Sequence, residues 1–102
     1  MFDFEDHLKK QYEWSEKTFG PGFKTYSILD HLEKELKEIK ADPVDLTEWI
    51  DVIILASDGA MRAGYTPAEV IAALVAKMEV NRNRLWPRWQ ESDPNKAIEH
   101  IR

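Results

Sequence analysis

A connection of only four residues, 41–44, separates two segments whose apolar side chains repeat at helical spacing. Before it, steps of three and four predict a helix over about 26–40, with one apolar stripe formed by Leu29, Leu32, Leu36 and Ile39. After it, Asp45 and Glu48 have the spacing of a helix cap and its reciprocal partner, and the helix should continue to about Arg62, before Gly64. Because the connection is short, the second helix is expected to return antiparallel to the first.

Two further helices are predicted on either side of this hairpin. The first spans about 4–18 and ends before the breaker Gly20-Pro21-Gly22. The last begins at Thr66-Pro67-Ala68-Glu69, which combines a cap, a first-turn proline and an acid, and runs to about residue 85. A short helix over 95–101 is expected in the tail. No strand pattern is present, so the sequence predicts an all-α, small helical bundle of about four helices in one domain, 1–102.

Composition excludes several classes of protein. The 102 residues include no cysteine, which excludes disulfide scaffolds and thiolate metal sites. A net charge of −5 argues against non-specific nucleic-acid binding. The first residues are acidic, unlike a signal peptide, and no run reaches the roughly 18 apolar residues of a membrane span. We therefore expect a cytoplasmic protein with neither nucleic acid nor membrane as partner.

Four acids are placed symmetrically about the hairpin turn. Glu38 and Glu48 each lie five residues from Pro43, and Glu35 and Asp51 each lie eight residues from it. In an antiparallel hairpin Glu38 is level with Glu48, and Glu35 with Asp51, the two levels being about 4.5 Å apart. The four carboxylates should therefore converge.

Convergence of four carboxylates requires compensation of their charge. Apolar residues cover most of the circumference of the helix that carries Glu48 and Asp51, so these acids need a partner. A hard divalent cation such as Mg²⁺ or Mn²⁺ is suited to oxygen ligands. The alternative is that Glu48 only caps its helix, while the glutamates of the preceding helix form a solvated face that pairs with Lys34, Lys37 and Lys40.

A second group of polar residues interrupts the apolar face of the last helix. Lys77, Asn81 and Arg84 follow one another at steps of four and three. Their side chains suit phosphate oxygens, although they can also extend to solvent or bridge to acids of the hairpin. Trp14 and Phe19 can stack on a base, or belong to a core or an interface.

Histidine gives a weaker signal. His31 lies four residues before Glu35 and is either a supporting partner of that acid or a surface residue. The three histidines of the chain share no helical face, so a histidine metal site is not expected.

The acidic motifs resemble those of the MazG-like all-α nucleoside triphosphate pyrophosphohydrolases, in which Glu-Glu-x-x-Glu precedes Glu-x-x-Asp. Here these are Lys34-Glu35-Leu36-Lys37-Glu38 and Glu48-Trp49-Ile50-Asp51, so a lysine replaces the first acid of the triplet. The chain is most similar to the phage and bacterial dATP/dGTP diphosphohydrolases. That similarity extends over further segments: Trp14-Ser15, Thr18-Phe19-Gly20-Pro21-Gly22, Asp45-Leu46 through Asp58-Gly59, Lys77, Asn81, Arg84 and Trp86-Pro87.

The resemblance implies cleavage of a purine (deoxy)nucleoside triphosphate, such as dGTP or dATP, into a monophosphate and pyrophosphate. The four acids would hold two or three Mg²⁺ or Mn²⁺ ions, with Glu38 or Glu35 acting instead as base or orienting a water. Lys77, Asn81 and Arg84 would stabilise charge on the phosphates. The resemblance also implies a homo-oligomer, dimer or tetramer, in which a neighbouring chain completes the base pocket, and a role in remodelling the nucleotide pool, in the host cytoplasm if a phage encodes the chain.

Two alternatives remain open from the sequence. One is a non-catalytic helical module whose acidic hairpin docks a basic partner. The other is a house-cleaning hydrolase of damaged or non-purine nucleotides on the same scaffold.

Overall fold

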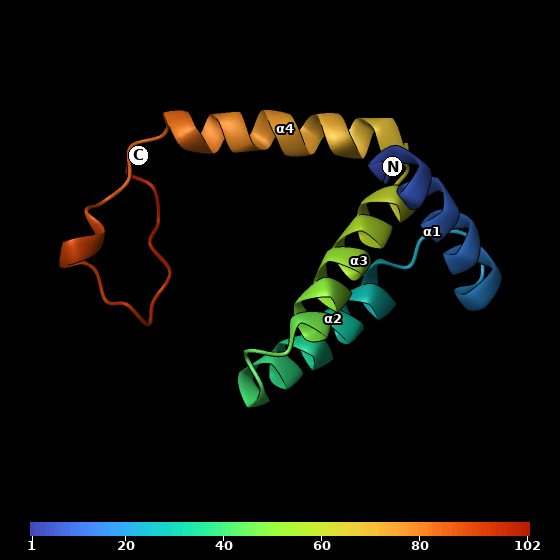
Figure 1. Ribbon diagram of the computed structural model, residues 1–102, viewed down its shortest axis with the longest axis horizontal. Coiled ribbons are helices and arrows are strands. Elements are labelled where there is room, and N and C mark those ends of the chain that lie inside the picture. Colours follow the sequence, from blue (N-terminus) through green and yellow to red (C-terminus); the bar gives the residue numbers. More distant parts are fainter. The chain divides into compact units, whose positions relative to one another are not determined.

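A computed structural model describes residues 1–102 and contains four α-helices and one short 3₁₀-helix (Figure 1). In chain order they are α1 (Phe4–Phe19), α2 (Thr25–Ala41), α3 (Leu46–Arg62), α4 (Pro67–Asn83) and η1 (Trp89–Glu91). The only β-type pairing is one isolated bridge between Leu85 and Ile101. The predicted all-α class is confirmed, and none of the helices has the length and apolar character needed to cross a membrane.

The chain divides into two compact units, Met1–Ile71 and Ala72–Arg102, and the boundary falls within α4. The single domain expected from the sequence stays a prediction.

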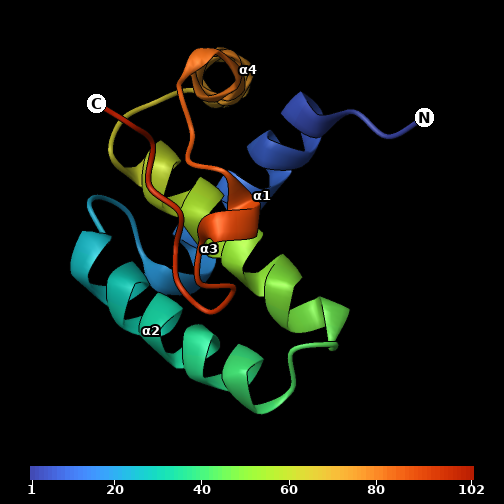
Figure 2. The same ribbon diagram turned by 90° about the vertical axis from the view of Figure 1, so that its left-hand side faces the viewer.

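In the first unit, α2 and α3 form the expected antiparallel hairpin and α1 packs against α3 (Figure 2). The turn between α2 and α3 is fixed by the indole N–H of Trp49, which donates to the carbonyl of Pro43 at 2.9 Å. The small apolar core consists of Leu8, Ile28, Ile39 and Met61.

The apolar stripe predicted for α2 is only partly correct. The buried residues of α2 are Ile28, Glu35 and Ile39, whereas Leu29 and Leu36 are 49% and 52% exposed. The face that packs on α3 is therefore rotated from the predicted stripe and includes an acid. The physical reason is that the hairpin register requires Glu35 to face α3, which turns Leu29 and Leu36 outward.

α3 is also less buried than its apolar composition predicts. Trp49, Ile50 and Ile53 are 50%, 41% and 54% exposed. One face of this helix packs against both α1 and α2.

The helix caps follow the sequence prediction in one case and depart from it in another. Thr66 and Glu69 form the full reciprocal cap of α4, with bonds of 3.1 and 3.2 Å. At the start of α3, Asp45 accepts from the backbone N–H of Thr47 at 3.0 Å, but its own N–H bonds to Asp42 rather than to the predicted partner, Glu48. The Glu48 carboxyl is therefore free for the site described below.

A buried polar network joins the end of α1 to the end of α3. Arg62 donates from Nη1 to the carbonyls of Gly20 and Gly22 at 2.7 and 2.9 Å, and from Nη2 to Ser15 Oγ at 2.9 Å. Its Nε lies 3.4 Å from Asp58 Oδ1, and Ser15 donates to Asp58 Oδ2 at 2.7 Å. Four of the five N–H donors of the guanidinium reach protein acceptors, so the network fixes the α1–α2 connection against α3.

In the second unit, no residue of α4 is buried, and the tail loops back to the end of this helix. Ile101 donates its backbone N–H to Leu85 at 2.7 Å, and the indole N–H of Trp86 donates to the carbonyl of Asn81 at 2.8 Å. The short helix predicted over 95–101 is wrong. Asp93 caps a single turn by accepting from Asn95 at 2.8 Å, after which the pairing with Leu85 holds the chain extended.

Arg62→Met should destabilise the protein strongly, because Asp58 would be left buried without its cation. The expected loss of unfolding free energy in urea titrations is about 3–5 kcal/mol, and the double variant Asp58→Leu/Arg62→Met should recover most of it. Lys10→Met, which breaks the exposed Asp6–Lys10 pair, is the control and should change little. Wild-type stability in Arg62→Met would show that the network does not hold the fold.

Candidate metal centre

Three carboxylates converge where α2 and α3 meet. Glu35 and Glu38 lie one helical turn apart on α2 and Glu48 faces them from α3, with one oxygen of each within 4.8 Å of the others. Glu35 is buried, Glu48 is half-buried and Glu38 is exposed. Glu35 Oε2 and Glu48 Oε2 are buried and have no hydrogen-bond partner. Hard, anionic oxygens without partners are what a divalent cation such as Mg²⁺ or Mn²⁺ requires, so these residues fit a metal.

The close approach of these carboxyls raises the pKa of one of them, Glu48. The neighbouring carboxyls of Glu38 and then Glu35 favour the protonated form, and burial adds to their effect, so the pKa of Glu48 rises from 4.5 to about 8. A proton therefore compensates part of the charge when no cation is bound. A divalent cation would displace that proton.

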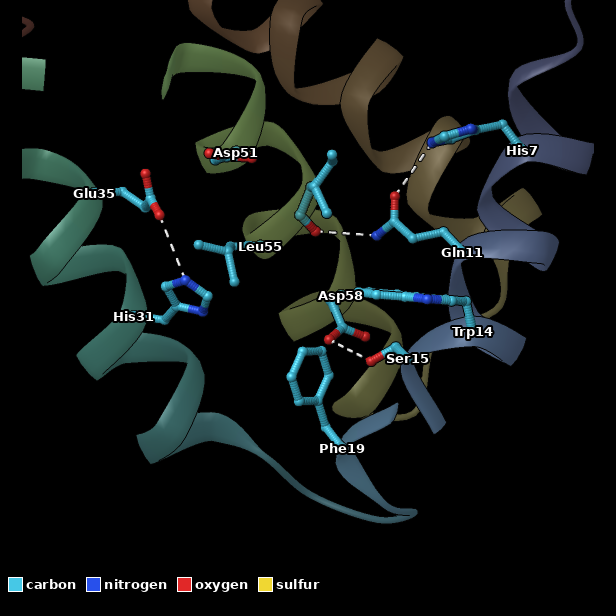
Figure 3. A pocket seen from close by; sticks show the side chains of 11 residues that line it. His7, Gln11, Trp14, Ser15, Phe19, His31, Glu35, Asp51, Leu55 and Asp58 are labelled. Atoms are coloured by element: carbon cyan, nitrogen blue, oxygen red, sulfur yellow. Dashed lines mark hydrogen bonds and ion pairs between the residues drawn. The ribbon is translucent and has the colours of Figure 1, made fainter. Parts of the chain in front are cut away.

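The fourth predicted acid, Asp51, lies beside this cluster. Asp51 and Glu35 both line a cavity of about 390 Å³ between the three helices of the first unit (Figure 3). Asp51 is not among the residues whose oxygens lie within 4.8 Å of one another. The predicted register therefore brings Glu35, Glu38 and Glu48 together and leaves Asp51 on the cavity side of them.

His31 supports the cluster from within α2. Its Nε2 lies 3.4 Å from Glu35 Oε1, and the imidazole is half exposed. Of the two possibilities that the sequence left open, the structure shows contact with the acid.

Trp14 and Phe19 line the other end of the same cavity. Their rings meet edge to face, with centroids 5.5 Å apart, and both side chains are more than half exposed. Leu55 lies between this aromatic end and the acidic end (Figure 3). The arrangement offers an apolar surface for a flat ring at one end and oxygen ligands at the other.

Ser15 and Asp58 were missed as cavity residues by the sequence reasoning. Both line the cavity at its aromatic end, and both belong to the buried network with Arg62. A signal was present, because Asp58 and Arg62 lie four residues apart in the narrow polar stripe of an apolar helix. That spacing is typical of an internal ion pair, which the structure shows between Asp58 and Arg62.

The predicted phosphate-binding residues belong to the second unit. Arg84 follows the end of α4, and its Nη1 donates to Asn81 Oδ1 at 3.4 Å. Asn81 and Arg84 are half-buried, and Lys77 is exposed. Their role toward phosphates stays a prediction.

Comparison with known proteins places the chain in a family. The family model described as dATP/dGTP pyrophosphohydrolase matches residues 7–102. The chain belongs to this family. The resemblance drawn from the acidic motifs and their flanking segments is therefore confirmed.

Two phage proteins are similar to this family member over part of their length. The Eaa protein of Salmonella phage P22 is 36% identical over 86 residues, which are 84% of this chain and 27% of that protein. A dATP/dGTP diphosphohydrolase of Salmonella phage PMBT28 is 33% identical over 87 residues, 84% of this chain and 29% of that protein. The chain thus spans less than a third of the length of these relatives.

One solved structure matches this family member along its whole length. It is the cyanophage S-2L MazG-like pyrophosphohydrolase bound to dGDP and three catalytic Mn²⁺ ions per active site, with a TM-score of 0.76 and 28% identity. The match covers 100% of both chains, which confirms the MazG-like fold.

The metal-free protein should become less stable as pH rises from about 5 to about 8. The folded-state pKa of Glu48 lies above its ordinary value, so its contribution is complete below 4.5 and is lost as pH rises through about 8. Thermal unfolding in the presence of a chelator measures this dependence.

Glu48→Gln should flatten the pH dependence of unfolding, because it removes the proton site. Glu33→Gln, a change at an exposed acid of α2, is the matched control and should keep the wild-type slope. An identical slope in wild type and Glu48→Gln would contradict the assignment.

Proposed function

We propose that this chain hydrolyses purine deoxynucleoside triphosphates such as dGTP and dATP between the α- and β-phosphates, releasing a monophosphate and pyrophosphate. One observation carries the proposal: three carboxylates lie within 4.8 Å, two with buried unpaired oxygens, beside a cavity that ends in an aromatic pair. Membership of the dATP/dGTP pyrophosphohydrolase family supports it, as does the dGDP and Mn²⁺ bound by the cyanophage relative.

The acids Glu35, Glu38, Glu48 and Asp51 would hold two or three Mg²⁺ or Mn²⁺ ions. Bound there, the cations supply positive charge to phosphate oxygens and increase the acidity of water. Glu38 is the exposed member of the cluster, so Glu38, or Glu35 beside it, accepts a proton from the attacking water or orients that water. His31 orients Glu35 through the 3.4 Å contact, as a residue that supports a metal ligand does.

Trp14 and Phe19 hold the base in this proposal. Their exposed ring surfaces line the cavity, and a base stacked there removes apolar area from water. Leu55 and Ile54 add apolar lining between the base and the acids. The substrate is thus oriented with its phosphates toward the carboxylates.

Lys77, Asn81 and Arg84 bind the triphosphate oxygens in this proposal. Lysine and arginine supply charge-assisted hydrogen bonds, and the amide of Asn81 supplies a further donor. Lys77→Ala should raise KM or lower kcat/KM about tenfold or more, since a hydrogen bond to a charged group contributes about 1.5–3 kcal/mol. Arg82→Ala is the control from the same helix, because Arg82 is exposed and pairs with Glu79 at 3.2 Å. Equal kinetics in the two variants would remove Lys77 from the site.

We also propose that the chain acts as a homo-oligomer, a dimer or tetramer in which a neighbouring copy completes the base pocket. Leu46, Ile50 and Ile53 share the face of α3 that lies roughly opposite Glu48, and they are 69%, 41% and 54% exposed. A second copy would cover this apolar face. Light scattering distinguishes an oligomer from a monomer. Such an enzyme would act on the nucleotide pool of the cytoplasm, that of the host if a phage encodes it.

Incubation with each (d)NTP and Mg²⁺ or Mn²⁺, followed by separation of the products, tests the reaction. The expected products from dGTP and dATP are the monophosphate and pyrophosphate. Glu48→Gln should lower the rate by more than about 100-fold, because loss of a residue that merely supports a metal ligand already costs about 10- to 100-fold. Glu33→Gln should leave the rate unchanged. No turnover of any triphosphate would refute the proposal, and a diphosphate product would place the cleaved bond elsewhere.

A further inference from the structure

The aromatic end of the cavity contains a charged group that the proposed reaction does not use. Asp58 is only 7% exposed, yet it lines the cavity together with Trp14, Ser15 and Phe19 (Figure 3). Glu35 and Asp51, two of the acids proposed as metal ligands, lie at the opposite end, beyond Leu55. A carboxylate next to a base-stacking surface, and remote from the metal ligands, calls for its own explanation.

Asp58 is held in one orientation by two donors. Ser15 donates to Oδ2 at 2.7 Å, and Arg62 Nε faces Oδ1 at 3.4 Å. Arg62 is anchored in turn by the carbonyls of Gly20 and Gly22, at 2.7 and 2.9 Å. The carboxylate is therefore fixed relative to the turn that directly follows Phe19.

The part of the cavity wall formed by Ser15 and Asp58 has free hydrogen-bond acceptors, but the Ser15 hydroxyl has no free donor. The hydroxyl of Ser15 has a single hydrogen, which it gives to Asp58, and its oxygen receives a bond from Arg62. Each oxygen of Asp58 has two lone pairs and receives one protein donor, so acceptor capacity remains on both. At this point the cavity wall can accept hydrogen bonds but the Ser15 hydroxyl has none to donate.

Such a wall favours a base that presents donors. Guanine carries an exocyclic amino group and an adjacent N–H, and adenine carries an exocyclic amino group. A base that presents only a carbonyl there would place an oxygen against the carboxylate and leave it unpaired, which costs more than a missing contact.

We propose that Asp58 accepts a hydrogen bond from the exocyclic amino group of the purine, and thereby determines which bases are used. This group is on C2 of guanine and on C6 of adenine, so the two bases are turned differently in their plane when they meet Asp58. The inference rests on the proposed function, since it assumes a nucleotide with its phosphates at the acidic end. Arg62 and Ser15 are positioning residues that act through Asp58. Trp14 and Phe19 stack on any flat ring and so contribute affinity, whereas Asp58 discriminates between bases.

Paired substrates that differ only in the amino group test the proposal. Wild-type kcat/KM should be about tenfold or more higher for dGTP than for dITP, and higher for dATP than for the deoxypurine triphosphate that lacks the 6-amino group. Asp58→Asn should reduce both ratios several-fold, toward one. A ratio is independent of the fraction of folded protein, so partial unfolding of the variant does not affect the result.

Two controls separate recognition from stability. Asp30→Asn changes an exposed acid of α2 that pairs with Lys34 and should keep both ratios. Ser15→Ala keeps the Asp58 carboxylate but removes one of its two donors, so it should lower the ratios less than Asp58→Asn. Equal ratios in wild type and Asp58→Asn would overturn the proposal.

Binding measurements keep this inference distinct from the proposed activity. In calorimetry with Mn²⁺ present, wild type should bind dGMP about tenfold more tightly than dIMP, whether or not it turns over any triphosphate. If triphosphates are hydrolysed but dGTP and dITP react equally, the role of Asp58 is refuted and the proposed function stands. If Asp58→Asn does not fold, the wild-type comparison of amino and deamino bases decides alone, and the absence of a preference overturns the proposal.

Discussion

The packing of α2 against α3 brings together three carboxylates that repel one another, and the site depends on this constraint. Apolar contacts of Ile28 and Ile39 hold the hairpin closed, while Glu35, Glu38 and Glu48 oppose that closure. Without a cation, a proton on Glu48, whose pKa is raised by the neighbouring carboxyls, relieves part of the repulsion. Because the hairpin already holds the acids together, a cation bound there would not have to order them. It would displace the proton and reduce the remaining repulsion.

α3 carries charged side chains in two different environments, one without hydrogen-bond partners and one with them. Toward its start, Glu48 has a buried oxygen without any partner. In its last turns, Asp58 and Arg62 compensate each other, and Ser15 and two backbone carbonyls complete their bonds. Glu48 therefore keeps an acceptor without a partner, whereas the Asp58 carboxylate is held in place by Ser15 and Arg62. Arg62 also places a positive charge at the carboxyl end of α1, where the helix dipole favours one. From the same helix, Asp51 lines the cavity beside the acidic cluster and Asp58 lines it from within the buried network.

Much of this site was readable from spacing, because the decisive rules are local. The symmetry of the acids about Pro43 needs only helical rise and a short turn, and three of the four acids do meet. The cap at Thr66 is likewise determined by neighbouring residues. Packing was harder to predict. Leu29 and Leu36 fit an apolar stripe as well as Ile28 does, and only contact with α3 decides that Glu35 faces inward. The tail was misread because the bond from Ile101 to Leu85 links residues distant in sequence, which no helical periodicity records.

Lys34 shows how one residue adjusts the charge of the site. The family resemblance assigns an acid to this position, and here the ammonium pairs with Asp30 at 3.3 Å on an exposed part of α2. Because the Asp30–Lys34 pair is exposed, it contributes little to stability. Lys34 then affects the site mainly through its charge. Replacing an acid by a lysine changes the local charge by two units, which reduces both the repulsion among the acids and their attraction for cations. Beside this lysine, Glu35 and Glu48 each keep a buried oxygen without a partner. His31 contacts Glu35 from the same helix and adds a second potentially cationic group next to the acids.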